Sequence, residues 1–74
     1  MWIKSEDADE IVRFTGYVLN GVIHSHIDGR SILKIDFDNF APEDIDIISA
    51  SIENNMLHIV LETEEELLIP IRDD

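Results

Sequence analysis

The Asn20-Gly21 pair, flanked on both sides by alternating apolar residues, is the feature that most constrains the fold. Asn-Gly favours the two-residue turn of a β-hairpin, because both turn residues of that turn need a positive φ. The pattern predicts that Ile11–Leu19 pairs with Val22–Ile27 and that Val18 faces Ile23. The other pairs expected in this register are Gly16 with Ser25, Phe14 with Ile27, Tyr17 with His24, Thr15 with His26 and Arg13 with Asp28.

The stretch Ser31–Ile48 carries the same period-two alternation, which is typical of a half-buried strand. A three-residue loop over Ile27–Gly29, with Gly29 in the left-handed conformation, would connect it to the hairpin. This loop pairs Ile23 with Leu33, whereas a two-residue loop would place Ile23 opposite a lysine. We therefore favour the three-residue loop.

The second half of the chain predicts a further hairpin, with its turn at Asn54-Asn55. The expected pairs are Ile52 with Leu57, Ala50 with Ile59 and Ile48 with Leu61. The Ile-rich run Ile45–Ile52 favours a strand, with a bulge near Ile47–Ile48 where the apolar residues change phase. A short helical turn after Pro42, near residues 41–48, is the alternative. Leu67–Ile71 is expected as a last strand, at an edge because Pro70 cannot donate a hydrogen bond.

The predicted fold class is therefore all-β: a small antiparallel meander of five or six strands, forming a barrel or a sandwich. Trp2-Ile3-Lys4 is read as a short edge strand or a tethered terminus. The segments Ser5–Glu10 and Glu62–Glu66 are read as acidic loops.

The length of 74 residues predicts a single domain, residues 1–74, near the size at which one hydrophobic core is marginal. There are no cysteines to supply disulfides or zinc-thiolate sites. We therefore expect a homodimer, which would cover apolar residues on the polar strand faces. Those residues are Leu19, Val22, Met56 and Val60.

The net charge of −12 disfavours nucleic acid and anionic membranes as direct partners and favours a basic protein. The chain has no signal-peptide pattern, so we expect a whole cytoplasmic protein. The acidic residues expected to form a partner-binding surface are Asp36, Asp38, Glu43, Asp44, Asp46, Glu62, Glu64, Glu65 and Glu66. Carboxylates two apart on one strand face lie about 6.6–6.8 Å apart, so neighbouring rows of them can imitate the phosphates of a duplex. The plainer interpretation is a solvated acidic surface.

In its small size, acidity, strand content and lack of cysteine, the chain resembles the DNA-mimic inhibitors that bacteriophages encode. That resemblance implies a protein that blocks a basic host protein, such as a nucleoid protein or a repair or defence enzyme, inside a bacterial cell. A local resemblance links Leu33–Phe37, Phe40–Ile47 and Glu53–Ile59 to the α-crystallin domain of small heat-shock proteins. It implies a β-sandwich with a protein-interaction or chaperone-like role, which is the alternative function.

Other chemistry finds little support in the sequence. His24 and His26 lie two apart on one strand, but no third ligand faces them in the predicted register, so we expect surface histidines and no metal site. The stretch that begins at Asp36 fails the calcium-loop pattern, which needs glycine where Ala41 stands. No cysteine nucleophile, catalytic triad or phosphate-binding loop is present, and we expect neither an enzyme nor a cofactor.

Overall fold

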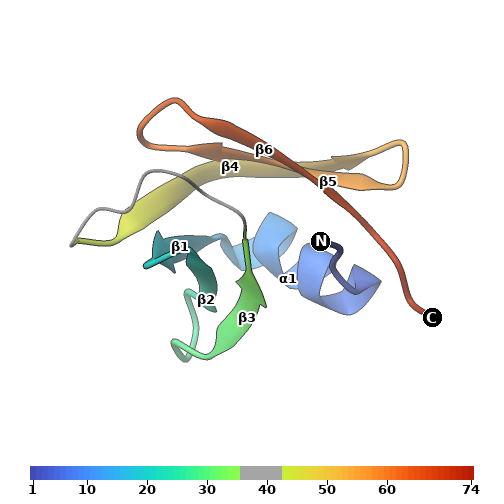
Figure 1. The fold of residues 1–74 in the computed structure, drawn as a ribbon, viewed down its shortest axis with the longest axis horizontal. Coiled ribbons are helices and arrows are strands. Elements are labelled where there is room, and N and C mark those ends of the chain that lie inside the picture. The colour runs from blue at the N-terminus through green and yellow to red at the C-terminus, as the bar shows by residue number, and fades with distance from the viewer. Residues whose placement is uncertain (36–42) are drawn as a thin grey trace.

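The computed structural model describes residues 1–35 and 43–74. One helix precedes six strands, which form a single antiparallel sheet in the order β3-β2-β1-β4-β5-β6 (Figure 1). The elements are α1 (Ser5–Phe14), β1 (Gly16–Leu19), β2 (Val22–Ser25), β3 (Ser31–Lys34), β4 (Ile45–Glu53), β5 (Met56–Leu61) and β6 (Glu66–Pro70). The sheet is curled into a half-barrel, so the predicted all-β class is confirmed, in its barrel-like rather than its sandwich form.

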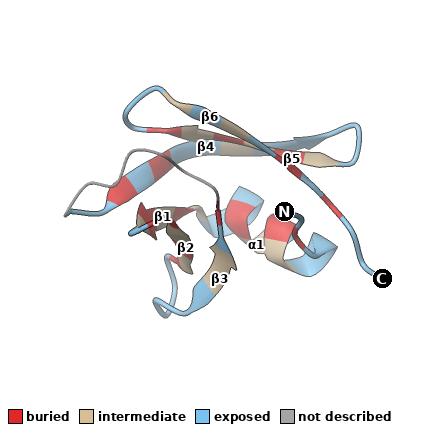
Figure 2. Ribbon diagram, in the orientation of Figure 1, coloured by how far each residue is buried: buried red, intermediate tan, exposed pale blue. Residues whose placement is uncertain are grey.

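The core lies inside the curl, between the β1–β3 half and the β4–β6 half of the sheet (Figure 2). Helix α1 packs against β4 and contributes two fully buried side chains, Ala8 and Ile11. The strands contribute alternate residues, as in β5, where Leu57, Ile59 and Leu61 are all buried. Burial of this apolar surface is the main force that closes the sheet around the helix. No helix of the described residues has the length and apolar character needed to cross a membrane.

The prediction of an acidic loop at Ser5–Glu10 is wrong, because this segment starts α1. Its acidic residues favour a helix, since Glu6 and Asp7 occupy the first turn, where the helix dipole is positive. Near the other end, Arg13 pairs with the carboxylate four residues earlier at 3.1 Å. The helix ends at Phe14, and the following residue, Thr15, turns the chain into β1 with a φ of 58° and a ψ of −155°.

The Asn20-Gly21 hairpin is confirmed close to its turn and wrong at its far end. Strands β1 and β2 pair Val18 with Ile23, as predicted. The predicted pairs Tyr17–His24 and Gly16–Ser25 also form. The pairs of Phe14, Thr15 and Arg13 with Ile27, His26 and Asp28 do not form, because α1 continues to Phe14 and β2 stops at Ser25. Both Phe14 and Ile27, expected as a cross-strand pair on a mostly apolar face, are exposed.

The next connection keeps the predicted register through a different loop. Ile23 pairs with Leu33, and Gly29 has a positive φ of 74°, both as expected. However, the loop spans five residues, 26–30, and a register shift lies between Ile23 and His24. The buried Ser25 organises the loop, because its hydroxyl accepts a hydrogen bond from the Ile27 N–H at 3.1 Å.

Strands β4 and β5 form the predicted second hairpin. The helical alternative near residues 41–48 is wrong from Ile45 onward, where β4 begins; residues 41 and 42 lie outside the described part. Ala50 pairs with Ile59 and Ile52 with Leu57, as predicted. The expected bulge is also present, between Ile47 and Ser49. Because of this bulge, Leu61 pairs with Ile47 instead of the predicted Ile48, and Ile48 is exposed.

The last strand brings the two ends of the chain together. Ile69 and Ile71 are buried and Leu67 is half-buried, as predicted, while β6 begins at Glu66, inside the segment predicted as a loop. Beyond β6, Ile71 forms a parallel bridge with Ile3, which confirms a tethered terminus at the start of the chain. The Asp73 carboxylate also accepts a hydrogen bond from the Ser5 N–H at the first turn of α1, at 2.8 Å.

Candidate functional site

The candidate site is a group of exposed carboxylates where β4 begins and where β5 turns into β6. We call it the acidic end, and its members are Glu43, Asp44, Asp46, Glu62, Glu64 and Glu66. Both segments lie at the same end of the sheet in Figure 1. Two hydrogen bonds join them: Glu62 N–H donates to Asp46 O at 2.9 Å, and Asp46 N–H donates to Glu62 Oε1 at 3.2 Å. The curl therefore unites carboxylates from two separate segments.

Three of the predicted partner-binding residues need separate mention. Asp36 and Asp38 lie outside the described residues, so their position relative to the acidic end stays a prediction. Glu65 is half-buried and accepts a hydrogen bond from the Thr63 hydroxyl at 3.2 Å, so it belongs to the turn itself. Within the acidic end, the Glu66 carboxylate contacts His58 Nε2 at 2.6 Å across the β5–β6 pair.

The arginines of the chain pair with acids in other places. Arg30 binds Asp7 and Glu10 of α1 at 3.2 and 2.9 Å. Its guanidinium lowers the pKa of the Glu10 carboxyl through this hydrogen bond. The other arginine pairs among the described residues are Arg30 with Asp28, Arg13 with Asp9 and Arg72 with Asp74. Within the ranges 1–35 and 43–74, no lysine or arginine forms an ion pair with the acidic end. Apart from the contact of Glu66 with His58, the carboxylates of the acidic end are exposed to solvent and can face a partner.

Of the two histidines, His24 forms the predicted pair with Tyr17, whereas His26 lies beyond the end of β2. The His24 ring stacks on Tyr17, its cross-strand neighbour, with 5.1 Å between ring centroids and an interplanar angle of 8°. His24 Nδ1 also lies 3.1 Å from the Gly29 carbonyl oxygen, while His26 is exposed in the loop. No group of three potential metal ligands is found in the described part of the chain.

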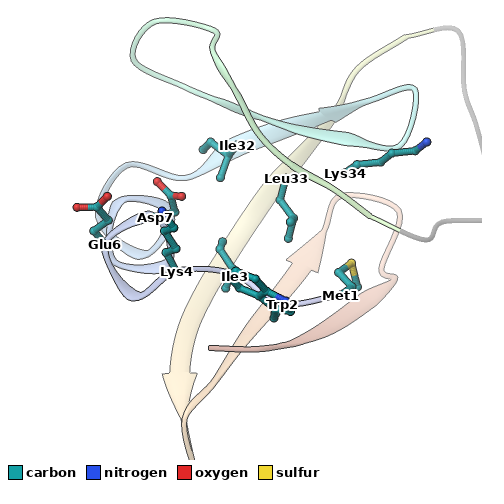
Figure 3. A pocket seen from close by; sticks show the side chains of 9 residues that line it. All are labelled: Met1, Trp2, Ile3, Lys4, Glu6, Asp7, Ile32, Leu33 and Lys34. Carbon is teal, nitrogen blue, oxygen red and sulfur yellow. The ribbon is translucent and has the colours of Figure 1, made fainter. Parts of the chain in front are cut away.

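A second feature is a cavity of about 490 Å³ that the sequence analysis missed (Figure 3). It lies between the N-terminal segment Met1–Lys4 and strand β3, at the open side of the half-barrel. Its apolar lining comes from Met1, Trp2, Ile3, Ile32 and Leu33, and its charged lining from Lys4, Glu6, Asp7 and Lys34. We call it the seam cavity. No local sequence pattern predicts this cavity, because it forms only where the N-terminal segment and β3, which are distant in the sheet order, approach each other.

The apolar residues expected to form a homodimer surface are only partly exposed. Leu19, Val22, Met56 and Val60 are all half-buried within the sheet. The homodimer stays a prediction. Comparisons of the chain with protein-family models, with curated proteins and with solved structures found no match.

Proposed function

We propose that this protein is a DNA mimic that binds a basic nucleic-acid-binding protein through its acidic end and blocks the binding of DNA. The observation that supports the proposal is the separation of the charges. The arginines are engaged by carboxylates of α1, the β2–β3 loop and the C-terminus. Among the described residues, Glu43, Asp44, Asp46, Glu62 and Glu64 of the acidic end form no ion pair with a lysine or arginine, and Glu66 contacts His58.

The geometry of β4 supports the same function. Asp46 is exposed between the buried Ile45 and Ile47, so the core fixes its side chain on the outer face. Asp44 precedes it by two residues, and the hydrogen bonds between Asp46 and Glu62 hold a second acidic segment alongside. Fixed rows of carboxylates lose little conformational freedom on binding, which suits a partner that normally grips the regular phosphates of a duplex.

The test is affinity capture from a bacterial lysate, followed by elution with duplex DNA. A mimic should retain basic DNA-binding proteins, and duplex DNA should release them because both ligands compete for one site. For a retained protein, the association rate should fall steeply with salt, since attraction between opposite charges steers the encounter. If the retained proteins are unfolded chains that duplex DNA does not release, the chaperone-like alternative is favoured instead.

A matched pair of variants separates the position of the charge from its total. The first neutralises four carboxylates of the acidic end, and the second neutralises four elsewhere, so both carry −12 + 4 = −8. The first set is Asp44→Asn, Asp46→Asn, Glu62→Gln and Glu64→Gln; the second is Glu6→Gln, Asp9→Asn, Glu53→Gln and Asp74→Asn. The first variant should associate at least about tenfold more slowly than the second at low salt. Equal rates for the two would refute the role of the acidic end.

A further inference from the structure

The seam cavity lies between two backbone edges, β3 and the N-terminal segment, and each edge has N–H and C=O groups that point away from its own sheet neighbour. Strand β3 is the last strand on its side of the sheet. Its Ile35 end is tied to the β2 side, because Ile35 N–H donates to Gly21 O at 2.8 Å. In an antiparallel ladder alternate residues point to opposite edges, so the N–H and C=O of Lys34 face away from β2. These groups face the seam.

The opposite edge is the N-terminal segment. Ile3 N–H donates to Pro70 O, and Ile3 O accepts from Arg72 N–H, both at 2.9 Å. The N–H and C=O of Ile3 are thus both hydrogen-bonded to the chain at the end of β6. By the same alternation Trp2 turns its N–H and C=O the other way, as does the N–H of Lys4, which has extended dihedral angles. No backbone hydrogen bond between this segment and β3 is found among the residues described.

The side chains around the seam have a distinct chemistry. Figure 3 shows Leu33 reaching from β3 toward the side of Trp2 and Ile3. Trp2 is 41% exposed, which leaves apolar surface of its ring open to a ligand. The two lysines of the chain, Lys4 and Lys34, both line the cavity from opposite edges, and neither forms an ion pair within the described residues. Two carboxylates, Glu6 and Asp7, also line the cavity, and Asp7 is paired with Arg30.

We propose that the seam cavity binds an extended peptide segment of a partner protein, which adds a strand between β3 and the N-terminal segment. An apolar side chain of the peptide packs against Trp2 and Leu33, and an acidic side chain lies beside Lys4 or Lys34. Two facing edges with no backbone hydrogen bond between them in the described part of the chain favour a peptide over a compact small molecule, because only a backbone supplies donors and acceptors to both sides. The volume of about 490 Å³ lies in the range of ligand pockets. This site is separate from the acidic end and does not depend on its proposed function.

The probe is a library of capped hexapeptides presented to the intact protein. Enriched peptides should combine β-branched or aromatic residues with Asp or Glu. Their binding can be followed through Trp2, because it is the only tryptophan of the chain and lines the cavity. In an enriched peptide, N-methylation should weaken binding about threefold to tenfold at each of the central amides, because a strand paired on both sides turns successive N–H groups alternately to β3 and to the N-terminal segment.

Variants of Lys34 test the backbone contact directly. Lys34→Ala removes the charge, and Lys34→Pro removes both the charge and the outward-facing N–H, which an edge strand tolerates. Binding should fall for Lys34→Ala, and it should fall further for Lys34→Pro. Leu68→Asp, at an exposed leucine of β6, is the control that should bind like the parent. Circular dichroism establishes that each variant is folded.

Several results would overturn the peptide proposal. One is a lack of enriched peptides with the parent protein, and another is unchanged binding after N-methylation of the central amides. If dodecanoate binds the cavity and the peptides do not, the site takes an apolar carboxylate. If sedimentation shows a dimer that Lys34→Pro dissociates, a second copy of the chain occupies the seam.

Discussion

Replacing Gly16 by alanine tests the packing of the β1–β2 hairpin. A Cβ atom added at Gly16 would lie 2.5 Å from the main-chain oxygen of His24 in β2. Carbon–oxygen contacts between neighbouring strands usually measure about 3.3–3.6 Å, so the overlap is about 0.8 Å. Because the obstacle is backbone held in the β1–β2 ladder, the strands must separate to accept the methyl group.

The expected cost follows from two opposing terms. Overpacking a tight site costs about 1–3 kcal/mol, while replacing glycine by alanine restricts the unfolded chain and returns about 0.4–1 kcal/mol. We expect Gly16→Ala to lower the free energy of unfolding by about 1–2 kcal/mol. At about 4–8 °C per kcal/mol for a domain of this size, the Tm should fall by about 4–16 °C.

Urea and thermal unfolding followed by circular dichroism measure this change. Ser51→Ala, at an exposed position of β4, is the control and should stay within about 0.5 kcal/mol of the parent. Strand propensity alone predicts the opposite result at Gly16, because alanine is the better residue in a strand. A Gly16→Ala protein as stable as the parent, or more stable, would therefore refute the close approach of β1 to His24.

Three further predictions concern stability. Thr15→Gly should raise the Tm, because φ of 58° with ψ of −155° is a conformation that costs a non-glycine residue about 1–3 kcal/mol; an unchanged or lower Tm would contradict this strain. Leu57→Ala should lower the free energy of unfolding by about 2–5 kcal/mol, since Leu57 is fully buried, and a smaller loss in urea unfolding would show that the core is looser than described. The hydrogen bond from Ser5 lowers the pKa of Asp73 below its usual 3.8, so this carboxylate stabilises the fold above pH 3.8 and stops doing so as the pH falls through its folded-state pKa. Asp73→Ala should be less stable than the parent at pH 7, and the difference should shrink below about pH 3.8; a difference that is constant with pH would exclude this role.

The sequence predicts the strand pairs that depend on nearby residues. Val18 with Ile23 and Ala50 with Ile59 follow from a tight turn and alternating burial, which are local properties. The bulge at Ile48 is equally local, because it shows as a change of phase in the apolar pattern.

The helix is not predicted, because the acidic composition of Ser5–Glu10 favours a loop. The segment does carry helix signals. They are the acidic Glu6 and Asp7 in the first turn, the basic Arg13 in the last turn, and the apolar Ala8 three residues before Ile11. Of the acidic end, the sequence predicts which residues are exposed. It does not predict that Asp46 and Glu62 would be hydrogen-bonded, because that contact depends on the bulged pairing of β4 with β5. The seam cavity depends on the closure of the whole sheet, for which the sequence holds no local signal.

The large sequence separation between the two chain ends determines when their contact can form during folding. Ser5 and Asp73 are separated by 68 positions along the sequence, whereas the hairpins join residues that are close together. Loop-closure entropy makes distant contacts costly until the intervening chain is ordered, so the hairpins should form first and the terminal bridge last. Substitutions at Ile3 or Ile71 should then speed unfolding while leaving the refolding rate nearly unchanged, because their contacts are absent from the folding transition state.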